Sequence, residues 1–150
     1  MSIPLLFDLG AEFELKLSAC YAKLEFSVKT DSDAAILRQI AQDELNHSSV
    51  LRSGKVYALR LPDLFGKELI QVADIKAGIG LLEALLLDLD KGENPISGLR
   101  RLLALEKRFE QVHLDTAVEI KDASLQKLFR HLSGEDQRHI QLLTEMIARS

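Results

Sequence analysis

Residues 42–50 read QDELNHSSV, a stretch that places Glu44 and His47 three residues apart. On an α-helix, residues i and i+3 lie on the same face, so both side chains can point into one cavity. Residues 134–142 read GEDQRHIQL and repeat this spacing with Asp136 and His139. One such pair arises easily by chance in a helical chain rich in glutamate, but two pairs with the same spacing indicate a shared function.

The two pairs belong to an internal duplication of the chain. Glu14 lies 30 residues before Glu44, and Glu106 lies 30 residues before Asp136. A shift of 92 residues therefore superimposes the acids and histidines of the first half on those of the second half. Each half is predicted to be a helical hairpin of the same length. The same shift matches further identical residues: Lys29 with Lys121, Ser32 with Ser124, Arg38 with Arg130 and Leu51 with Leu143.

Apolar residues recur with helical periodicity in four long segments, at residues 3–28, 32–54, 95–121 and 123–149. Asp31, Ser32 or Asp33 can cap the start of the second segment. Pro95 suits the first turn of the third segment. The acids and histidines of the duplication fall on the apolar stripes of these segments. They are therefore predicted to face the core rather than the solvent.

A long connection, residues 55–93, joins the second segment to the third. It contains RLPDLFG at 60–66, which predicts a turn, and an apolar piece at 73–89, which predicts a shorter fifth helix ending at DKGENP. Leucines cover most of the circumference of this piece, so either the bundle or a second subunit must cover them. Four helices with one long crossover are the wiring of a ferritin-like four-helix bundle, so we predict an all-α fold of that kind.

The composition is that of one globular domain spanning residues 1–150. Hydrophobic residues make up 47% and charged residues 28% of the chain, which predicts a folded protein. A formal net charge of −4 provides no basic surface for nucleic acid or an anionic membrane. The N-terminus lacks the basic region of a signal peptide, and the apolar run at 77–87 is too short to cross a bilayer. A soluble cytoplasmic protein is therefore expected.

The single cysteine, Cys20, excludes an internal disulfide and a four-cysteine metal site within this chain. Such a composition suits a reducing compartment. We expect Cys20 to be a small packed residue rather than a redox thiol, because it lies off the inward-facing series of its segment. Glu12, Glu25 and His131 are expected on the surface.

Burying the acids of the duplication together would be costly unless cations neutralise them, because a lone buried carboxylate is normally forced to take up a proton. Divalent metal ions remove the repulsion, since carboxylates balance their charge and imidazole nitrogens complete the coordination. Two ions can be held when two acids bridge them and each ion also binds one terminal acid and one histidine. This is the ligand pattern of carboxylate-bridged di-iron bundles.

The chain resembles the rubrerythrin-like branch of the ferritin-like superfamily. The resemblance runs through ELKLSACY and DELNH in the first half and through LALEKRFEQVHL and LSGEDQRHI in the second. It implies two iron ions per chain, with manganese or zinc as possible replacements. The implied metal ligands, which would also be the catalytic residues, are Glu14, Glu44, His47, Glu106, Asp136 and His139.

Within that set, the resemblance implies that Glu44 and Asp136 bridge the two ions, while the upstream acid and the histidine of each half serve one ion. Tyr21 follows Glu14 by seven residues, as a tyrosine does in the family's first helix. His113 occupies the equivalent position in the second half. Either residue could hydrogen-bond a ligand or be an ordinary core residue.

The sequence departs from the family pattern in three ways. Asp136 is one methylene shorter than the usual glutamate, which should alter the bridging geometry, and Glu135 is a possible substitute. The additional acid that rubrerythrins carry near the third-helix glutamate is missing, because the positions three residues to either side of Glu106 are Leu103 and Phe109. Glu110 is close and, like Glu135, is a candidate for supporting a metal ligand, although the solvated face is its expected position. A rubredoxin-like set of four cysteines is missing from the sequence, so electrons would come from a separate donor protein.

The resemblance implies a non-haem di-iron oxidoreductase that reduces hydrogen peroxide or dioxygen, with a homodimer as the expected assembly. One alternative is the oxidation of ferrous iron for storage, which needs a closed shell of subunits rather than a dimer. An alternative from another class is a metal-free helical bundle that acts as a scaffold or interaction protein. Asp136 and the leucine-rich connection favour that last reading.

Overall fold

The computed structural model describes residues 2–61 and 71–150, and this part of the chain is all-helical, with five helices and no strand. The prediction of an all-α fold is therefore confirmed. The helices are α1 (Ser2–Glu25), α2 (Asp31–Ala58), α3 (Gln71–Asp90), α4 (Pro95–Glu119) and α5 (Ala123–Ala148).

The start of α2 differs from the sequence prediction. Thr30 is the N-cap, and its hydroxyl accepts a hydrogen bond of 3.1 Å from the backbone N–H of Asp33. Asp31 and Asp33 lie inside the first turn, where their negative charges interact favourably with the positive end of the helix dipole. The predicted cap at residues 31–33 is thus wrong by one to three positions, because threonine caps as well as aspartate does. At the other end, α2 continues to Ala58 rather than stopping at residue 54.

The boundary between α3 and α4 lies at the residues that the sequence predicts. Gly92 has a φ of 91° between α3 and α4, a conformation that favours glycine. Asn94 caps α4 by accepting from the backbone N–H groups of Ile96 and Ser97, and Pro95 is in the first turn as predicted. The turn predicted at 60–66 lies largely outside the described residues, which resume at residue 71.

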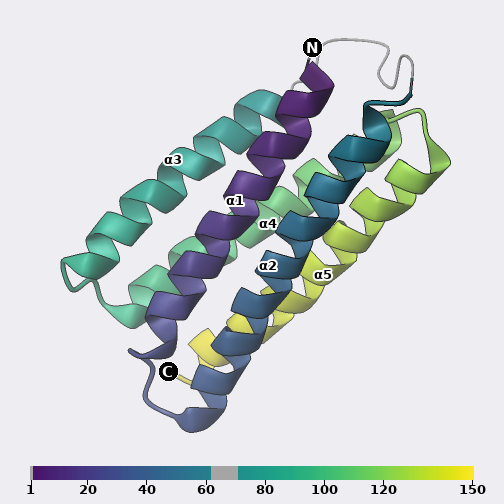
Figure 1. Ribbon diagram of the computed structural model, residues 1–150. Helices are drawn as coiled ribbons and strands as arrows, with labels where there is room; N and C mark the ends of the chain where they lie inside the picture. Colours follow the sequence, from purple (N-terminus) through teal and green to yellow (C-terminus); the bar gives the residue numbers. More distant parts are fainter. Residues whose placement is uncertain (1, 62–70) are drawn as a thin grey trace.

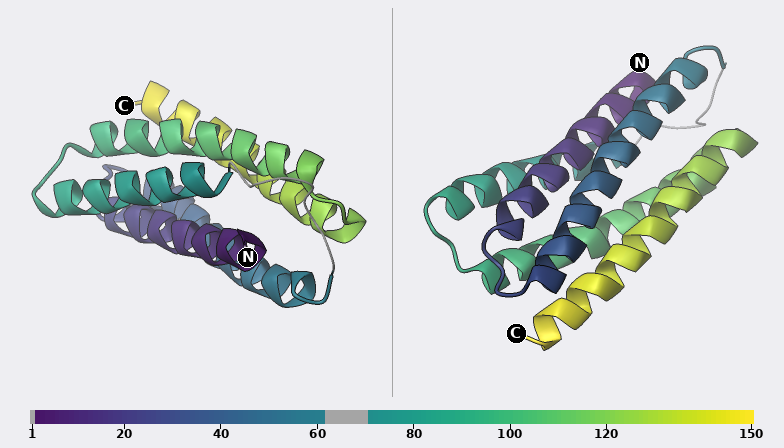
Figure 2. Two further views of the ribbon diagram at one scale, coloured as in Figure 1. Left: turned by 90° about the horizontal axis from the view of Figure 1, so that it is seen from above. Right: turned by 60° about the horizontal axis from the view of Figure 1, so that its bottom comes forward.

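The five helices lie lengthwise in one bundle (Figure 1). α1 and α2 form one antiparallel pair and α4 and α5 form a second, and the two pairs pack together through α2 with α5 and α1 with α4. α3 runs the length of the bundle beside α1, so α4 begins at the same end as α2 and runs in the same direction (Figures 1 and 2). Each half of the duplication is therefore a helical hairpin, as the sequence predicts.

α3 packs on the bundle through a tight contact at Gly78. A Cβ at this position would lie 2.6 Å from the ring of Phe109, which stacks on Phe13 with ring centroids 3.6 Å apart. Leu82 and Leu85 are buried, whereas Leu81 and Leu87 expose 48% and 61% of their surface. The bundle thus covers one side of α3, and cover of the other side by a second subunit remains a prediction. None of the described helices is long and apolar enough to span a membrane.

Candidate metal centre

The six predicted ligands come from the four long helices and all face the interior of the bundle. None of them exposes more than 3% of its surface. α1 and α4 supply one acid each, and α2 and α5 each supply an acid and a histidine one turn later. The residues are Glu14 on α1, Glu44 and His47 on α2, Glu106 on α4, and Asp136 and His139 on α5.

Two groups of side chains within this set have ligand atoms close enough to hold a metal ion. In the first group, one atom each of Glu14, Glu44 and His47 lies within 4.8 Å of the others. The second group meets the same criterion with Glu44, Glu106 and His139. Glu44 belongs to both groups, so its carboxylate lies where a bridge between two ions would have to be.

Polar atoms of these groups are buried without hydrogen-bond partners. Both oxygens of Glu44, both ring nitrogens of His47, Oε2 of Glu14 and Oε1 of Glu106 are unpartnered. A buried polar group without a partner costs about 1–3 kcal/mol, and more when it is charged. So many unpartnered acceptors at one place fit a bound cation, because carboxylate oxygens and imidazole nitrogens are metal ligands.

The two histidines approach these acids closely. Nδ1 of His139 is 3.0 Å from Oε2 of Glu106 and 3.0 Å from Oε1 of Glu44. Nδ1 of His47 is 3.5 Å from Oε1 of Glu44 and 3.9 Å from Oε2 of Glu14. The same ring nitrogen, Nδ1, therefore faces the acids in both halves of the duplication.

Because the carboxylates are crowded together, their pKa values shift in different directions. Burial and the charges of Glu14 and Glu106 raise the pKa of Glu44 well above its usual range. Burial also raises the pKa of Glu106 to about 7, although the hydrogen bond from His139 opposes the shift. For Glu14, burial favours the neutral form, but the contacts with Glu44 and His47 prevail and lower its pKa to about 2. The raised pKa of Glu44 favours its protonated form, whereas the lowered pKa of Glu14 favours its charged form.

Asp136 lies in neither group, although it is buried beside them. Its Oδ2 is 2.6 Å from Nδ1 of His113 on α4, a short hydrogen bond between two buried side chains. Burial raises the pKa of Asp136, although the neighbouring His113 opposes the shift. His113 is thus a hydrogen-bond partner of a predicted ligand, which was one of its two expected roles.

The structure adds Asp43, which the sequence analysis missed. Oδ2 of Asp43 on α2 is 3.0 Å from Nε2 of His139 on α5, and the carboxylate also pairs with Arg138. Its counterpart in the second half, Glu135, has Oε1 3.8 Å from Nε2 of His47. An acid of each hairpin therefore faces the histidine of the other hairpin. Such contacts fix the orientation of a ligating imidazole and strengthen it as a donor.

Tyr21 is fully buried next to the second group, and its hydroxyl has no hydrogen-bond partner. Burial, together with the charges of Glu106 and Glu44, raises the pKa of this phenol well above its usual range. The hydroxyl therefore carries its proton at neutral pH and can donate a hydrogen bond inside the site.

Other candidates lie away from the site. Glu110 is half-buried and accepts a hydrogen bond from Gln137 at the surface. Glu12 and His131 are exposed, as predicted. Glu25 is half-buried and pairs with Arg38.

Cys20 is buried beside Tyr21, and burial raises the pKa of its thiol to about 12. Because the thiolate is the reactive form, we expect the native protein to resist alkylation at pH 8. Iodoacetamide followed by mass spectrometry should modify Cys20 only after unfolding in guanidinium. Rapid modification of the folded protein would contradict the packing role.

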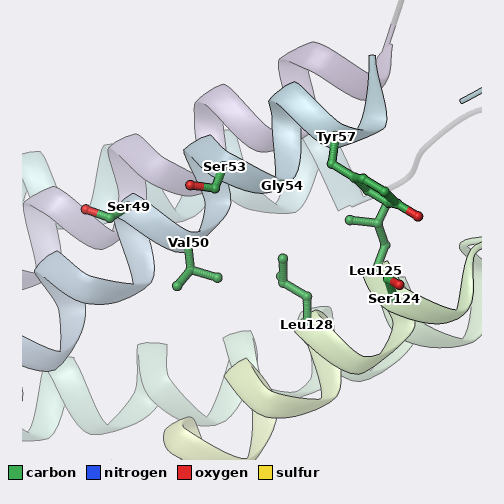
Figure 3. Close-up of a pocket in the computed structure, with 8 residues that line it drawn as sticks. All are labelled: Ser49, Val50, Ser53, Gly54, Tyr57, Ser124, Leu125 and Leu128. Atoms are coloured by element: carbon green, nitrogen blue, oxygen red, sulfur yellow. The ribbon is translucent and has the colours of Figure 1, made fainter. Parts of the chain in front are cut away.

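Two hollows flank the ligands. A groove of about 530 Å³ opens between α2 and α5, where Val50 and Leu128 point toward one another across the gap (Figure 3). None of its lining residues is a candidate ligand. A second, enclosed hollow of about 10 Å³, no larger than the space that one water molecule needs, is lined mostly by apolar side chains together with His113 and Thr116.

Comparisons of the chain with protein-family models, with curated proteins and with solved structures find no match. The donor set of carboxylates and imidazoles, the shared Glu44 and the unpartnered atoms fit two divalent cations of the first transition row.

Proposed function

We propose that the chain is a ferritin-like, rubrerythrin-like protein whose two-metal centre reduces hydrogen peroxide or dioxygen. The observation that carries the proposal is the position of Glu44, which is fully buried, unpartnered at both oxygens and a member of both groups. A scaffold protein would have no use for such a residue, because an unpartnered buried carboxylate destabilises the fold.

The first ion would be held by Glu14, Glu44 and His47, and the second by Glu44, Glu106 and His139. Iron bound there would supply the electrons for the reduction of the oxidant, and manganese or zinc are alternative occupants. A separate electron-donor protein would restore the reduced state. A reducing cytoplasm would suit both the ferrous ions and the free thiol of Cys20.

The protein part of the chemistry is the supply of protons and the exclusion of bulk water. Reduction of peroxide to water consumes protons as well as electrons. Tyr21 would keep its proton, because burial raises its pKa, and its hydroxyl would donate a hydrogen bond beside Glu106 and Glu44. His113 is a buried group that can move a proton, between its Nδ1 and Asp136.

We expect the purified protein, loaded with ferrous iron without oxygen, to retain two ions per chain after desalting. Exposure to hydrogen peroxide should then produce the near-ultraviolet absorption of ferric iron, and a chemical reductant should reverse it. Metal content by plasma mass spectrometry and the absorption spectrum measure both results. Less than one ion per chain under generous loading would refute the proposed centre and favour a metal-free scaffold.

The size of the assembly distinguishes the proposed reaction from iron storage. A peroxide- or oxygen-reducing protein needs no more than a homodimer, whereas storage needs a closed shell around a mineral core. Sedimentation of the iron-loaded protein should therefore give a dimer, and a large shell retaining many ions per chain would support storage instead.

A further inference from the structure

The internal duplication pairs Glu44 with Asp136, yet these two carboxylates have different surroundings. Both oxygens of Glu44 lack a hydrogen-bond partner, and the residue belongs to both candidate groups. Asp136 belongs to neither group, because its Oδ2 is engaged by Nδ1 of His113 at 2.6 Å. Glu44 thus lies among the other candidate ligands, with Nδ1 of His139 3.0 Å from its Oε1, whereas Asp136 is held by a residue outside both groups.

The tether depends on a difference between the halves at one further position. The 92-residue shift places Tyr21 on His113. The hydroxyl of Tyr21 makes no hydrogen bond and so does not hold Glu44, whereas His113 holds Asp136. Nε2 of His113 also lies 3.8 Å from Oε1 of Glu14, so the imidazole stands between Asp136 and a ligand of the first group.

The surroundings of His113 hold its ring in place. The ring centroid is 6.3 Å from that of Phe109, edge to face at 74°, and 6.2 Å from that of Phe129. The side chain exposes only 7% of its surface. A ring packed in this way cannot turn away from Asp136 without disturbing the core, so the hydrogen bond is built into the fold.

We propose that His113 is a positioning residue that keeps Asp136 out of the metal centre, so that the two metal positions share a single carboxylate, Glu44, and fill unequally. This inference rests on the proposed two-metal centre. The first ion binds to Glu14, Glu44 and His47, none of which has to break the hydrogen bond between His113 and Asp136. The second ion must either bind without Asp136 or take this carboxylate from His113.

The hydrogen bond between His113 and Asp136 should lower the affinity of the chain for the second ion. A hydrogen bond to a charged group, lost on binding, lowers affinity about tenfold to a hundredfold. We therefore expect the wild-type protein to bind Mn²⁺ in two steps whose dissociation constants differ by at least about tenfold. Repulsion between two cations that share Glu44 also weakens the second step. A substitution at His113 leaves that repulsion in place, so the part of the difference that the substitution removes measures the hydrogen bond to Asp136.

The test compares Mn²⁺ isotherms, measured by calorimetry without oxygen, for the wild type and three variants. His113→Phe removes the tether and fills the space between Phe109 and Phe129. His113→Asn keeps a donor at the place of Nδ1. His131→Phe changes an exposed histidine on α5 and is the matched control.

His113→Phe should lower the dissociation constant of the second step by about tenfold or more, so that the two dissociation constants become more similar. His113→Asn and His131→Phe should keep the wild-type ratio of the two constants. If His113 were only a core residue, His113→Phe would change the melting temperature and leave that ratio unchanged. This result would refute the positioning role of His113 but not the proposed metal centre. Wild-type protein that binds no Mn²⁺ would instead refute the metal centre itself.

Discussion

Glu44→Ala should abolish the binding of both metal ions, whereas Glu106→Ala should remove only one. Glu44 is the residue common to the two groups, and Glu106 belongs to the second group alone. Loss of a residue that only supports a ligand typically costs 10- to 100-fold in metal affinity, so loss of a shared ligand should weaken both positions by at least about a hundredfold. Metal content per chain after anaerobic loading and desalting measures the difference.

The comparison needs variants that separate ligand loss from misfolding. Glu12→Ala removes an exposed acid two residues from Glu14 and should bind two ions as the wild type does. Circular dichroism should show the same helix content in Glu44→Ala, because this change removes a buried carboxylate that has no hydrogen-bond partner. If Glu44→Ala retained two ions, or if Glu106→Ala lost both, the shared position of Glu44 would be wrong.

The sequence predicted the parts of the site that depend on helical periodicity. Spacings of three and 30 residues within each half were enough to place the acids and histidines on inward-facing stripes, and all six are buried. The same reasoning predicted the crossover helix and the proline in the first turn of α4. These features are local to one helix or one hairpin, so sequence spacing determines them.

Contacts between the hairpins could not be predicted in this way. Asp43 precedes Glu44 by one residue, a step of about 100° around the helix, so periodicity alone places it off the inward-facing stripe. It approaches His139 only because α5 packs beside α2. The 92-residue shift does carry a signal, since it superimposes Asp43 on Glu135, and both acids face a histidine of the other hairpin.

The tether on Asp136 was missed for a related reason. The sequence identified the shorter side chain of Asp136 as a departure and placed His113 on the inner stripe. The direction of a side chain within a crowded core depends on its competing partners, however. His113 comes from a different helix and engages Asp136 at 2.6 Å.

The metal-free protein should lose stability as the pH rises from about 4.5 to about 9, the interval set by Glu106 and His139. Glu106 has an ordinary pKa of 4.5 and a folded pKa of about 7, so its contribution is full below pH 4.5 and is lost as the pH rises to about 7. For His139, burial opposes protonation, but Glu106 and Asp43 raise the pKa from 6.5 to about 9, so stability is lost between these values.

Bound metal should reverse the loss of stability with rising pH. Metal ions compete with protons for the same carboxylate and imidazole atoms, so their affinity rises with pH, and a ligand that binds only the folded state stabilises it. The rise in melting temperature that Mn²⁺ produces should therefore be small at about pH 5.5 and large at about pH 8.5. Thermal unfolding with chelator and with Mn²⁺ measures both curves. Glu106→Gln should flatten the metal-free curve between pH 4.5 and about 7, because the amide does not titrate. A metal-free protein whose stability rose with pH over this interval would show that protons do not occupy the place of the cations.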